Sequence, residues 1–236
     1  MSWLSQFINF KFYWINAIWF GLGFVLFTII GTLSHEAGHY IVAKQYFNSP
    51  SFHYGYVKYG DWKEVEPDWY NQRLDENDQL KPEFQEEFDR LLAMNKEQHF
   101  YTTLGGPLQT VFFGTIGFIW LLYRKKNSFA LKDWLLVFLA FFWSREVYMI
   151  CSQMFTWIQT GKLSSRSDET NLSSFFEWHP LSVSLMLGSI GFIIICYIIF
   201  FIIPLRHRFT FLISGFVGSI FGFWFWLDFL GPLILP

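Results

Sequence analysis

Two histidines and a glutamate fall within five residues of one apolar stretch, in the order His35-Glu36-Ala37-Gly38-His39. Side chains four residues apart lie on one face of a helix, so His35 and His39 can present two imidazole nitrogens to a single Zn²⁺. Zinc lowers the pKa of a water that it binds to about 7, and the adjoining carboxylate of Glu36 can accept that water's proton as a general base. The spacing therefore predicts a hydrolytic zinc site with one Zn²⁺ per chain.

The motif is expected to lie at membrane depth. A long apolar stretch precedes His35, and the apolar character continues from Tyr40 to Ala43, up to Lys44. With a rise of about 1.5 Å per residue, His35 and His39 lie on the order of 10 Å below the boundary that Lys44 marks. Ionisable groups at that depth are costly unless they are paired, bind a metal or face a wet cavity. The same pattern arises by chance on solvated helices, but this depth favours a catalytic metal site.

Three acids compete to be the third protein ligand, which leaves the fourth position to water. Asp168 lies in an extramembrane loop, residues 159–180, which could dip back toward the metal, and Asp228 approaches the same side of the membrane near the end of the chain. Glu146 lies near the middle of an apolar segment, and this depth disfavours it. Position alone leaves Asp168 and Asp228 open.

The composition predicts the elements that must carry these residues. The chain is 53% hydrophobic and 23% aromatic with only 15% charged residues, against about a quarter in soluble domains. Its apolar residues come in blocks of about 20, the length that a helix needs to cross a bilayer. We expect an all-α, polytopic transmembrane helical bundle with a small extramembrane insert. The five predicted spans are residues 14–43, 103–123, 134–158, 181–204 and 209–235.

The chain divides into three predicted parts. Residues 1–45 form an N-terminal interfacial segment and the first transmembrane helix, residues 46–100 form the extramembrane insert, and residues 101–236 hold four further spans and the loop 159–180. The insert has twelve Asp and Glu against six Lys and Arg, which indicates a solvated surface. Residues 82–98 carry apolar side chains at helical spacing, so we expect an amphipathic helix lying against the membrane part.

Basic residues in two short connections predict the orientation. By the positive-inside rule these connections are cytoplasmic, so the N-terminus is cytoplasmic and the insert, the loop 159–180 and the C-terminus lie outside. We expect a multi-pass integral protein of the cell (inner) membrane, with the lipid bilayer and a membrane-protein or peptide substrate as partners. The net charge of -2 and the lack of long basic runs indicate no nucleic-acid partner, and no oligomeric state is predicted. The basic residues are Arg124, Lys125, Lys126 and Lys132 after the second span, and Arg206 and Arg208 after the fourth.

Three places in the chain resemble the site-2 protease group of M50-type intramembrane zinc metalloproteases, in its compact M50B-like branch. The first is the motif from His35 to His39 with Ala43 one turn later. The second is Gly105-Gly106-Pro107-Leu108, similar to the Gly-Pro segment that borders the family's active site. The third is the Ser-Asp-x-x-x-Leu stretch from Ser167 to Leu172, followed by Pro180.

This resemblance implies an intramembrane protease in which His35, His39 and Asp168 bind zinc and Glu36 is the base. It favours Asp168 over Asp228, because Leu227-Asp228-Phe229 lacks the glycine of the commoner Leu-Asp-Gly form. Many members place an Asn three residues after the Gly-Pro proline, where this chain has Thr110. Gly106, Pro107, Gln109 and Thr110 are therefore predicted either to contact substrate or to orient a ligand.

Two other polar residues are candidates for the site. Arg145, next to Glu146 in the third span, either pairs with an acid structurally or orients a zinc ligand. His99 precedes the second span on the side of His39, where it is either a proton relay or substrate contact or a surface histidine.

Three other functions fit parts of the sequence. A gluzincin-type membrane protease would use Glu146 as its third ligand, but its catalytic domain lies outside the bilayer. A non-catalytic zinc-binding or chaperone-like membrane protein would have no need of a general base at Glu36. A transporter would account for polar groups at depth, and metal transport into vesicles without peptide cleavage would identify it.

Overall fold

A computed structural model describes residues 9–63, 65, 68–75, 79–124, 129–164 and 167–236. Five helical segments in it are long and apolar enough to cross a membrane, judged by length and composition. This confirms the predicted all-α bundle. The spans are Trp14–Tyr46, Pro82–Leu122, Leu131–Thr160, Ser182–Ile202 and Leu205–Ile234.

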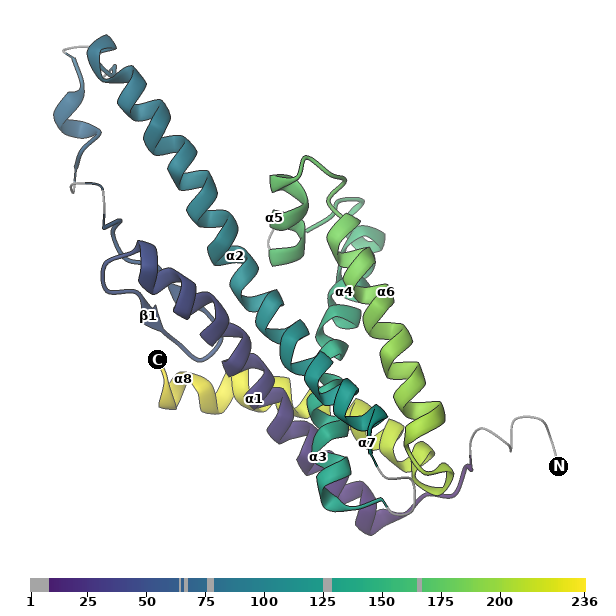
Figure 1. Cartoon of the computed structure of the whole chain (residues 1–236). Helices are drawn as coiled ribbons and strands as arrows, with labels where there is room; N and C mark the ends of the chain where they lie inside the picture. The colour runs from purple at the N-terminus through teal and green to yellow at the C-terminus, as the bar shows by residue number, and fades with distance from the viewer. Residues whose placement is uncertain (1–8, 64, 66–67, 76–78, 125–128, 165–166) are drawn as a thin grey trace.

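Two long helices form the frame that carries the motif. Helix α1 (Trp14–Tyr46) holds His35 and His39, and helix α2 (Gln85–Leu122) packs alongside it in the opposite direction. On the other side of α2 lie α4 (Ser144–Thr160) and α6 (Ser182–Tyr197), side by side in Figure 1, with the short α5 (Asp168–Phe175) between them in the chain. Helix α5 packs against α2, and Asp168 at its start contacts the histidines of α1.

Each of the last three spans joins an α-helix to a segment of 3-10 helix or π-helix. The third joins α3 (Leu131–Ala140) to α4 through a 3-10 turn, η4 (Phe141–Trp143). The fourth ends α6 in a π-helix, η5 (Ile198–Ile202). The last runs through α7 (Leu205–Trp224), a π-helix η6 (Phe225–Leu230) and α8 (Gly231–Ile234).

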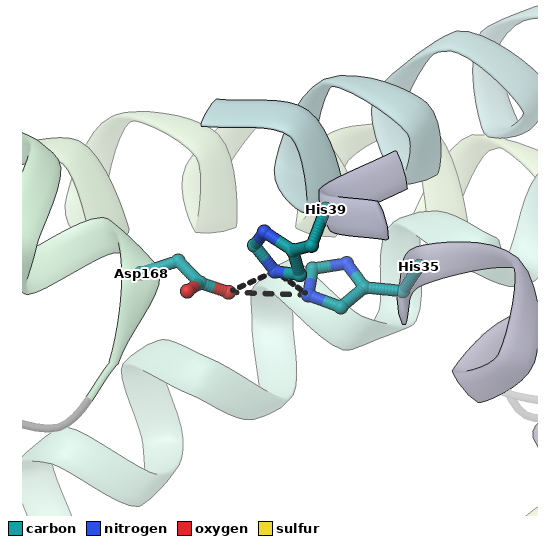
Figure 2. A group of neighbouring side chains, drawn as sticks. All are labelled: His35, His39 and Asp168. Carbon is teal, nitrogen blue, oxygen red and sulfur yellow. Dashed lines mark hydrogen bonds and ion pairs between the residues drawn. The ribbon is translucent and has the colours of Figure 1, made fainter. Parts of the chain in front are cut away.

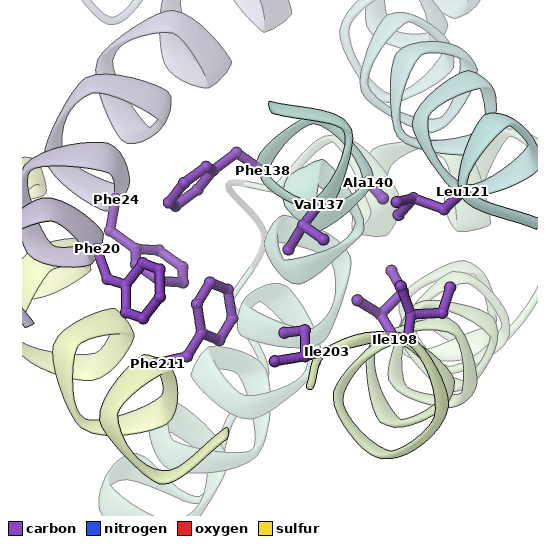
Figure 3. Close-up of a cluster of buried hydrophobic side chains, with 10 residues drawn as sticks. Phe20, Phe24, Leu121, Val137, Phe138, Ala140, Ile198, Ile203 and Phe211 are labelled. Atoms are coloured by element: carbon purple, nitrogen blue, oxygen red, sulfur yellow. The ribbon is translucent and has the colours of Figure 1, made fainter. Parts of the chain in front are cut away.

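The buried core lies along the first half of α1, away from the histidines. Phe20 and Phe24 of α1 meet Phe138 of α3 and Phe211 of α7 in edge-on and tilted ring contacts, with centroids 4.9 to 6.0 Å apart (Figure 3). Such arrangements are preferred over face-to-face stacking. Helices α1 and α7 pack together along this core. The first half of α1 therefore lies against the core, and the half that carries the motif packs against α2.

The insert differs from the predicted arrangement. The expected helix at residues 82–98 is not separate from the second span: a 3-10 turn, η3 (Pro82–Phe84), leads into α2, which continues without interruption to Leu122. No glycine or proline stands between residues 98 and 103 to end it. The segment Gly105-Gly106-Pro107, which was expected to open the second span, lies inside the helix, where neighbouring helices can compensate for the missing proline N–H.

The rest of the insert is a small hairpin held by the end of the chain. Strand β1 (Ser51–Phe52) pairs antiparallel with β2 (Val57–Lys58), and a 3-10 turn, η2 (Asn71–Arg73), follows. The backbone N–H of Tyr54 donates to the carbonyl of Leu235 over 3.1 Å, and the indole of Trp226 donates to the carbonyl of Tyr54 over 2.8 Å. Figure 1 accordingly shows the C-terminus beside β1.

The N-terminal segment is only partly described. Residues 9–13 precede α1 and are not helical, and the rest of the predicted interfacial segment lies outside the described residues. Lys125 and Lys126, which contribute to the predicted orientation, also lie outside them.

Candidate metal centre

The packing of α1 against α2 brings the motif against the Gly-Pro segment. Gly38 faces Gly105 at backbone contact, because a methyl group on Gly105 would lie 2.5 Å from the carbonyl oxygen of Gly38. At the next position, a methyl group on Gly106 would lie 2.6 Å from His35 Nε2 and would also strike the His39 ring. The two glycines of α2 therefore leave the space that both imidazoles occupy.

Three ligand atoms meet beside this contact (Figure 2). Asp168 Oδ2 lies 3.1 Å from His35 Nε2 and 3.3 Å from His39 Nε2, and the two nitrogens are 3.2 Å apart. Both histidines are buried, and Asp168 is partly buried. The structure thus brings together the two motif histidines and the acid that the resemblance favours.

Hydrogen bonds on the far side of each ring set the tautomers. His39 Nδ1 lies 2.7 Å from the main-chain oxygen of Thr102, which can only accept, so Nδ1 carries the hydrogen. His35 Nδ1 lies 3.0 Å from Thr110 Oγ1, whose own hydrogen goes to the carbonyl of Gly106 over 3.2 Å. In a neutral imidazole a hydrogen on Nδ1 leaves the lone pair on Nε2. Both Nε2 atoms are therefore ready to accept a cation.

A capped helix positions Asp168. Ser167 is the N-cap of α5, and its hydroxyl accepts the backbone N–H of Thr170 over 3.1 Å. From α4, the buried amide of Gln153 donates to Ser167 Oγ over 3.1 Å and to Thr170 Oγ1 over 2.9 Å. These bonds tie the first turn of α5 to a transmembrane helix, which fixes the start of α5 where Asp168 lies.

The charge state of Asp168 suits a ligand. Arg145 Nη2 donates to Asp168 Oδ2 over 3.2 Å, and such a charge-assisted hydrogen bond favours the carboxylate over the neutral acid. The carboxyl is therefore ionised.

The residues fit zinc in both chemistry and spacing. Zinc takes imidazole nitrogen and carboxylate oxygen at about 2.0–2.1 Å, and a tetrahedral ion at that distance sets its ligand atoms about 3.3 Å apart. The three atoms here are 3.1 to 3.3 Å apart. Two neutral imidazoles and one carboxylate also make up a three-ligand set of the kind that leaves a position open. Within the described residues, His35, His39 and Asp168 form the group of three or more potential metal-binding residues whose ligand atoms all lie within 4.8 Å of one another.

Glu36 stands beside this group and outside it. Its partly buried carboxylate is not one of the clustered ligand atoms, and across the described part of the chain it makes no hydrogen bond or ion pair. Successive helix positions point about 100° apart, which explains why Glu36 does not share the direction of His35. An unengaged carboxylate next to the ligands is the arrangement that a general base needs.

A tyrosine that the sequence did not single out responds to the same charges. Burial, and then the negative charges of Asp168 and Glu36, raise the pKa of Tyr59 to about 12. Tyr59 follows β2 and stacks on Phe47 with ring centroids 5.2 Å apart. The hairpin of the insert therefore lies near Asp168 and Glu36.

Arg145 joins the centre from α4. Its guanidinium contacts His35 and Asp168 through Nη2, and Glu146 and Glu169 through Nη1. The carboxylate of Glu146 lies close to the site but turns to Arg145 and is not one of the clustered ligand atoms. The sequence predicted that Arg145 either pairs with an acid or contacts a candidate zinc ligand. In the structure Arg145 does both.

Other predicted residues lie outside the cluster. Asp228 is exposed in η6, and His99 is exposed beside the rings of Phe47 and Trp62. Pro107 is buried inside α2, and Gln109 packs near Gly38. Across the described residues, none of these four forms a hydrogen bond or ion pair with the three clustered atoms.

Sequence reasoning missed several residues that support the site: Gly38, Tyr59, Thr102, Gln153 and Glu169. Gln153 and Glu169 carried a usable signal, because a polar residue in an apolar segment and a second acid beside Asp168 both need partners. Thr102 acts through its main-chain oxygen, which leaves no signal in the sequence.

Comparison of the chain with protein-family models, curated proteins and solved structures gives no match.

Proposed function

We propose that this protein is a membrane-embedded zinc metalloprotease that hydrolyses peptide bonds of membrane proteins, in the manner of the M50-type group that its motifs resemble. His35, His39 and Asp168 hold one zinc ion, and Glu36 is the general base. The observation that carries the proposal is the convergence of three lone-pair atoms 3.1 to 3.3 Å apart inside a bundle of membrane-length helices.

The chain's own residues account for each part of the reaction. Bound zinc would supply the Lewis acid that activates the attacking water and polarises the peptide carbonyl. Thr110 and the main chain at Thr102 keep the two imidazoles oriented. Glu36 accepts the proton of the attacking water and then gives it to the amine that leaves. The same carboxylate therefore takes up and releases the proton in each cycle.

The position of the centre points to the substrate class. His35 and His39 lie within a 33-residue helix that is long enough to span a bilayer, seven or more residues before its end at Tyr46. A peptide bond must therefore reach the centre at or below the membrane surface, which suits a membrane-protein segment. The basic connections support an orientation in which this end of α1 lies outside the cell membrane and the N-terminus lies in the cytoplasm.

Replacing Glu36 by Gln tests the proposal. The amide has nearly the same shape but cannot take the proton, so cleavage of a transmembrane peptide in proteoliposomes should fall by about 10²- to 10⁴-fold. Zinc content should stay at the wild-type level, because Glu36 is not a ligand. Glu86→Gln, at an exposed position in the first turn of α2, is the matched control and should cleave normally. Wild-type cleavage by Glu36→Gln would show that the assigned mechanism is wrong.

A further inference from the structure

Arg145 donates to the ligand atoms themselves. Its Nη2 lies 2.8 Å from His35 Nε2 and 3.2 Å from Asp168 Oδ2. A guanidinium has only donors, so His35 Nε2 must be the acceptor, in agreement with the tautomer that Thr110 sets.

This hydrogen bond uses an electron pair that a metal ion also needs. An imidazole nitrogen without hydrogen has a single lone pair in the plane of its ring. His35 Nε2 can therefore bond to Arg145 or to a metal ion, but not to both. Metal binding at the proposed centre requires that the Arg145–His35 hydrogen bond breaks.

Two buried acids accept hydrogen bonds from the other nitrogen of the Arg145 guanidinium. Nη1 donates to Glu169 Oε1 over 2.8 Å and to Glu146 Oε1 over 3.3 Å, and both glutamates are fully buried. The second oxygen of each, Oε2, is buried and makes no hydrogen bond. Buried acceptors without a donor are costly, so these two oxygens are the natural partners for an N–H released from His35.

We infer that Arg145 is a positioning residue that competes with the metal ion for His35, and that Glu146 and Glu169 retain it when the metal takes its place. The inference depends on the proposed metal centre. When metal is removed, the guanidinium holds His35 and Asp168 together and offsets the negative charge of Asp168. When metal enters, the N–H freed from His35 turns to an Oε2 atom of Glu146 or Glu169. Arg145 thereby keeps the ligands in place and lowers the metal affinity.

Opposite shifts in zinc affinity test this arrangement. Zinc dissociation constants of the purified full chain would be measured by competition with a chromophoric chelator. Arg145→Gln removes the competing charge, so zinc should bind tighter by on the order of tenfold, the value of one charge-assisted hydrogen bond. Glu169→Gln removes a charged acceptor for the released N–H, so zinc should bind more weakly by a similar factor.

Two further variants separate this role from a purely structural one. Arg145→Lys keeps a positive charge beside the buried glutamates but lacks the fork that reaches both sides, so it should fold and also bind zinc more tightly. Arg124→Gln changes a cation whose guanidinium lies over the Phe129 ring, 5.0 Å from its centroid, and should leave the affinity unchanged. The metal-free form of Arg145→Gln should melt at a lower temperature than metal-free wild type, with a larger increase on adding zinc.

The results distinguish this inference from the proposed function. If Arg145→Gln and Arg145→Lys both bind zinc as wild type does, or more weakly, the competition is overturned and the metal centre stands. If the wild-type chain binds no zinc, the proposed function and this inference both fall.

Discussion

Gly38 and Gly105 touch through their backbones where α1 packs against α2, since a methyl group on Gly105 would lie 2.5 Å from the carbonyl oxygen of Gly38. Gly38 is one of the three residues between His35 and His39, and Gly105 begins the Gly-Pro segment. Each glycine thus makes room for the other, and this close approach places the motif histidines against α2. The two sequence motifs work as one packing unit.

The next glycine of α2 gives a prediction about space at the centre. Gly106→Ala would place a methyl group 2.6 Å from His35 Nε2, so the imidazoles must move and zinc content should fall well below one ion per chain. Gly21→Ala, in the same bundle with no atom within 4 Å of the added methyl, should retain zinc. Metal analysis of both purified variants checks this, and full zinc in Gly106→Ala would mean that the ligands do not lie where described.

The third ligand can be tested by comparing two aspartates. Asp168→Ala removes the carboxylate that lies 3.1 and 3.3 Å from the imidazoles, so zinc retention should weaken strongly and cleavage should stop. Asp228→Ala should change neither, because that residue is exposed in η6. The opposite pattern, with zinc and cleavage lost only in Asp228→Ala, would move the ligand to the last span.

Thr110 holds His35 through Nδ1, the ring nitrogen that is not a candidate metal ligand. Thr110→Val keeps the shape but removes the hydroxyl that accepts the Nδ1 hydrogen over 3.0 Å. Loss of such a partner costs about 10- to 100-fold in metal affinity. Chelator competition should show this loss in Thr110→Val but not in Thr156→Val, whose hydroxyl bonds only to the main chain of α4. Equal affinities in the two variants would leave Thr110 without a role at the metal.

Local sequence patterns were sufficient to predict the helical bundle and the shared direction of the two motif histidines. Two histidines one helical turn apart share a face because helix geometry is local, and apolar blocks of span length leave few alternatives in a bilayer. The number of spans and the common direction of His35 and His39 agree with the described structure, whereas the second span begins at Pro82 and not at residue 103. The same rules separate Glu36 from the ligands.

Tertiary relationships could not be obtained in the same way. Asp168 is 133 residues from His35 along the chain, and position alone did not separate it from Asp228. The roles of Gln153 and Glu169 depend on how α4 packs against α5, which no local pattern encodes. The unbroken α2 does not follow from composition, because the change from polar to apolar residues near residue 100 is not accompanied by a helix-breaking residue.

The orientation in the membrane is a separate prediction from the basic connections. In a chain lacking Cys151 and Cys196, a cysteine at exposed Gln79 should react with an impermeant thiol reagent in intact cells. A cysteine at exposed Ala130, which precedes α3, should react only after the cells are opened. The reverse labelling would place the metal end of α1 toward the cytoplasm.

Metal content of the purified chain tests the central claim most directly. Wild-type protein, exchanged into metal-free buffer after purification with zinc, should retain about one Zn²⁺ per chain, because three protein ligands hold a catalytic ion. The double variant His35→Ala and His39→Ala should retain almost none, since only Asp168 remains. Near-stoichiometric zinc in that double variant, or no zinc in the wild type, would contradict the account.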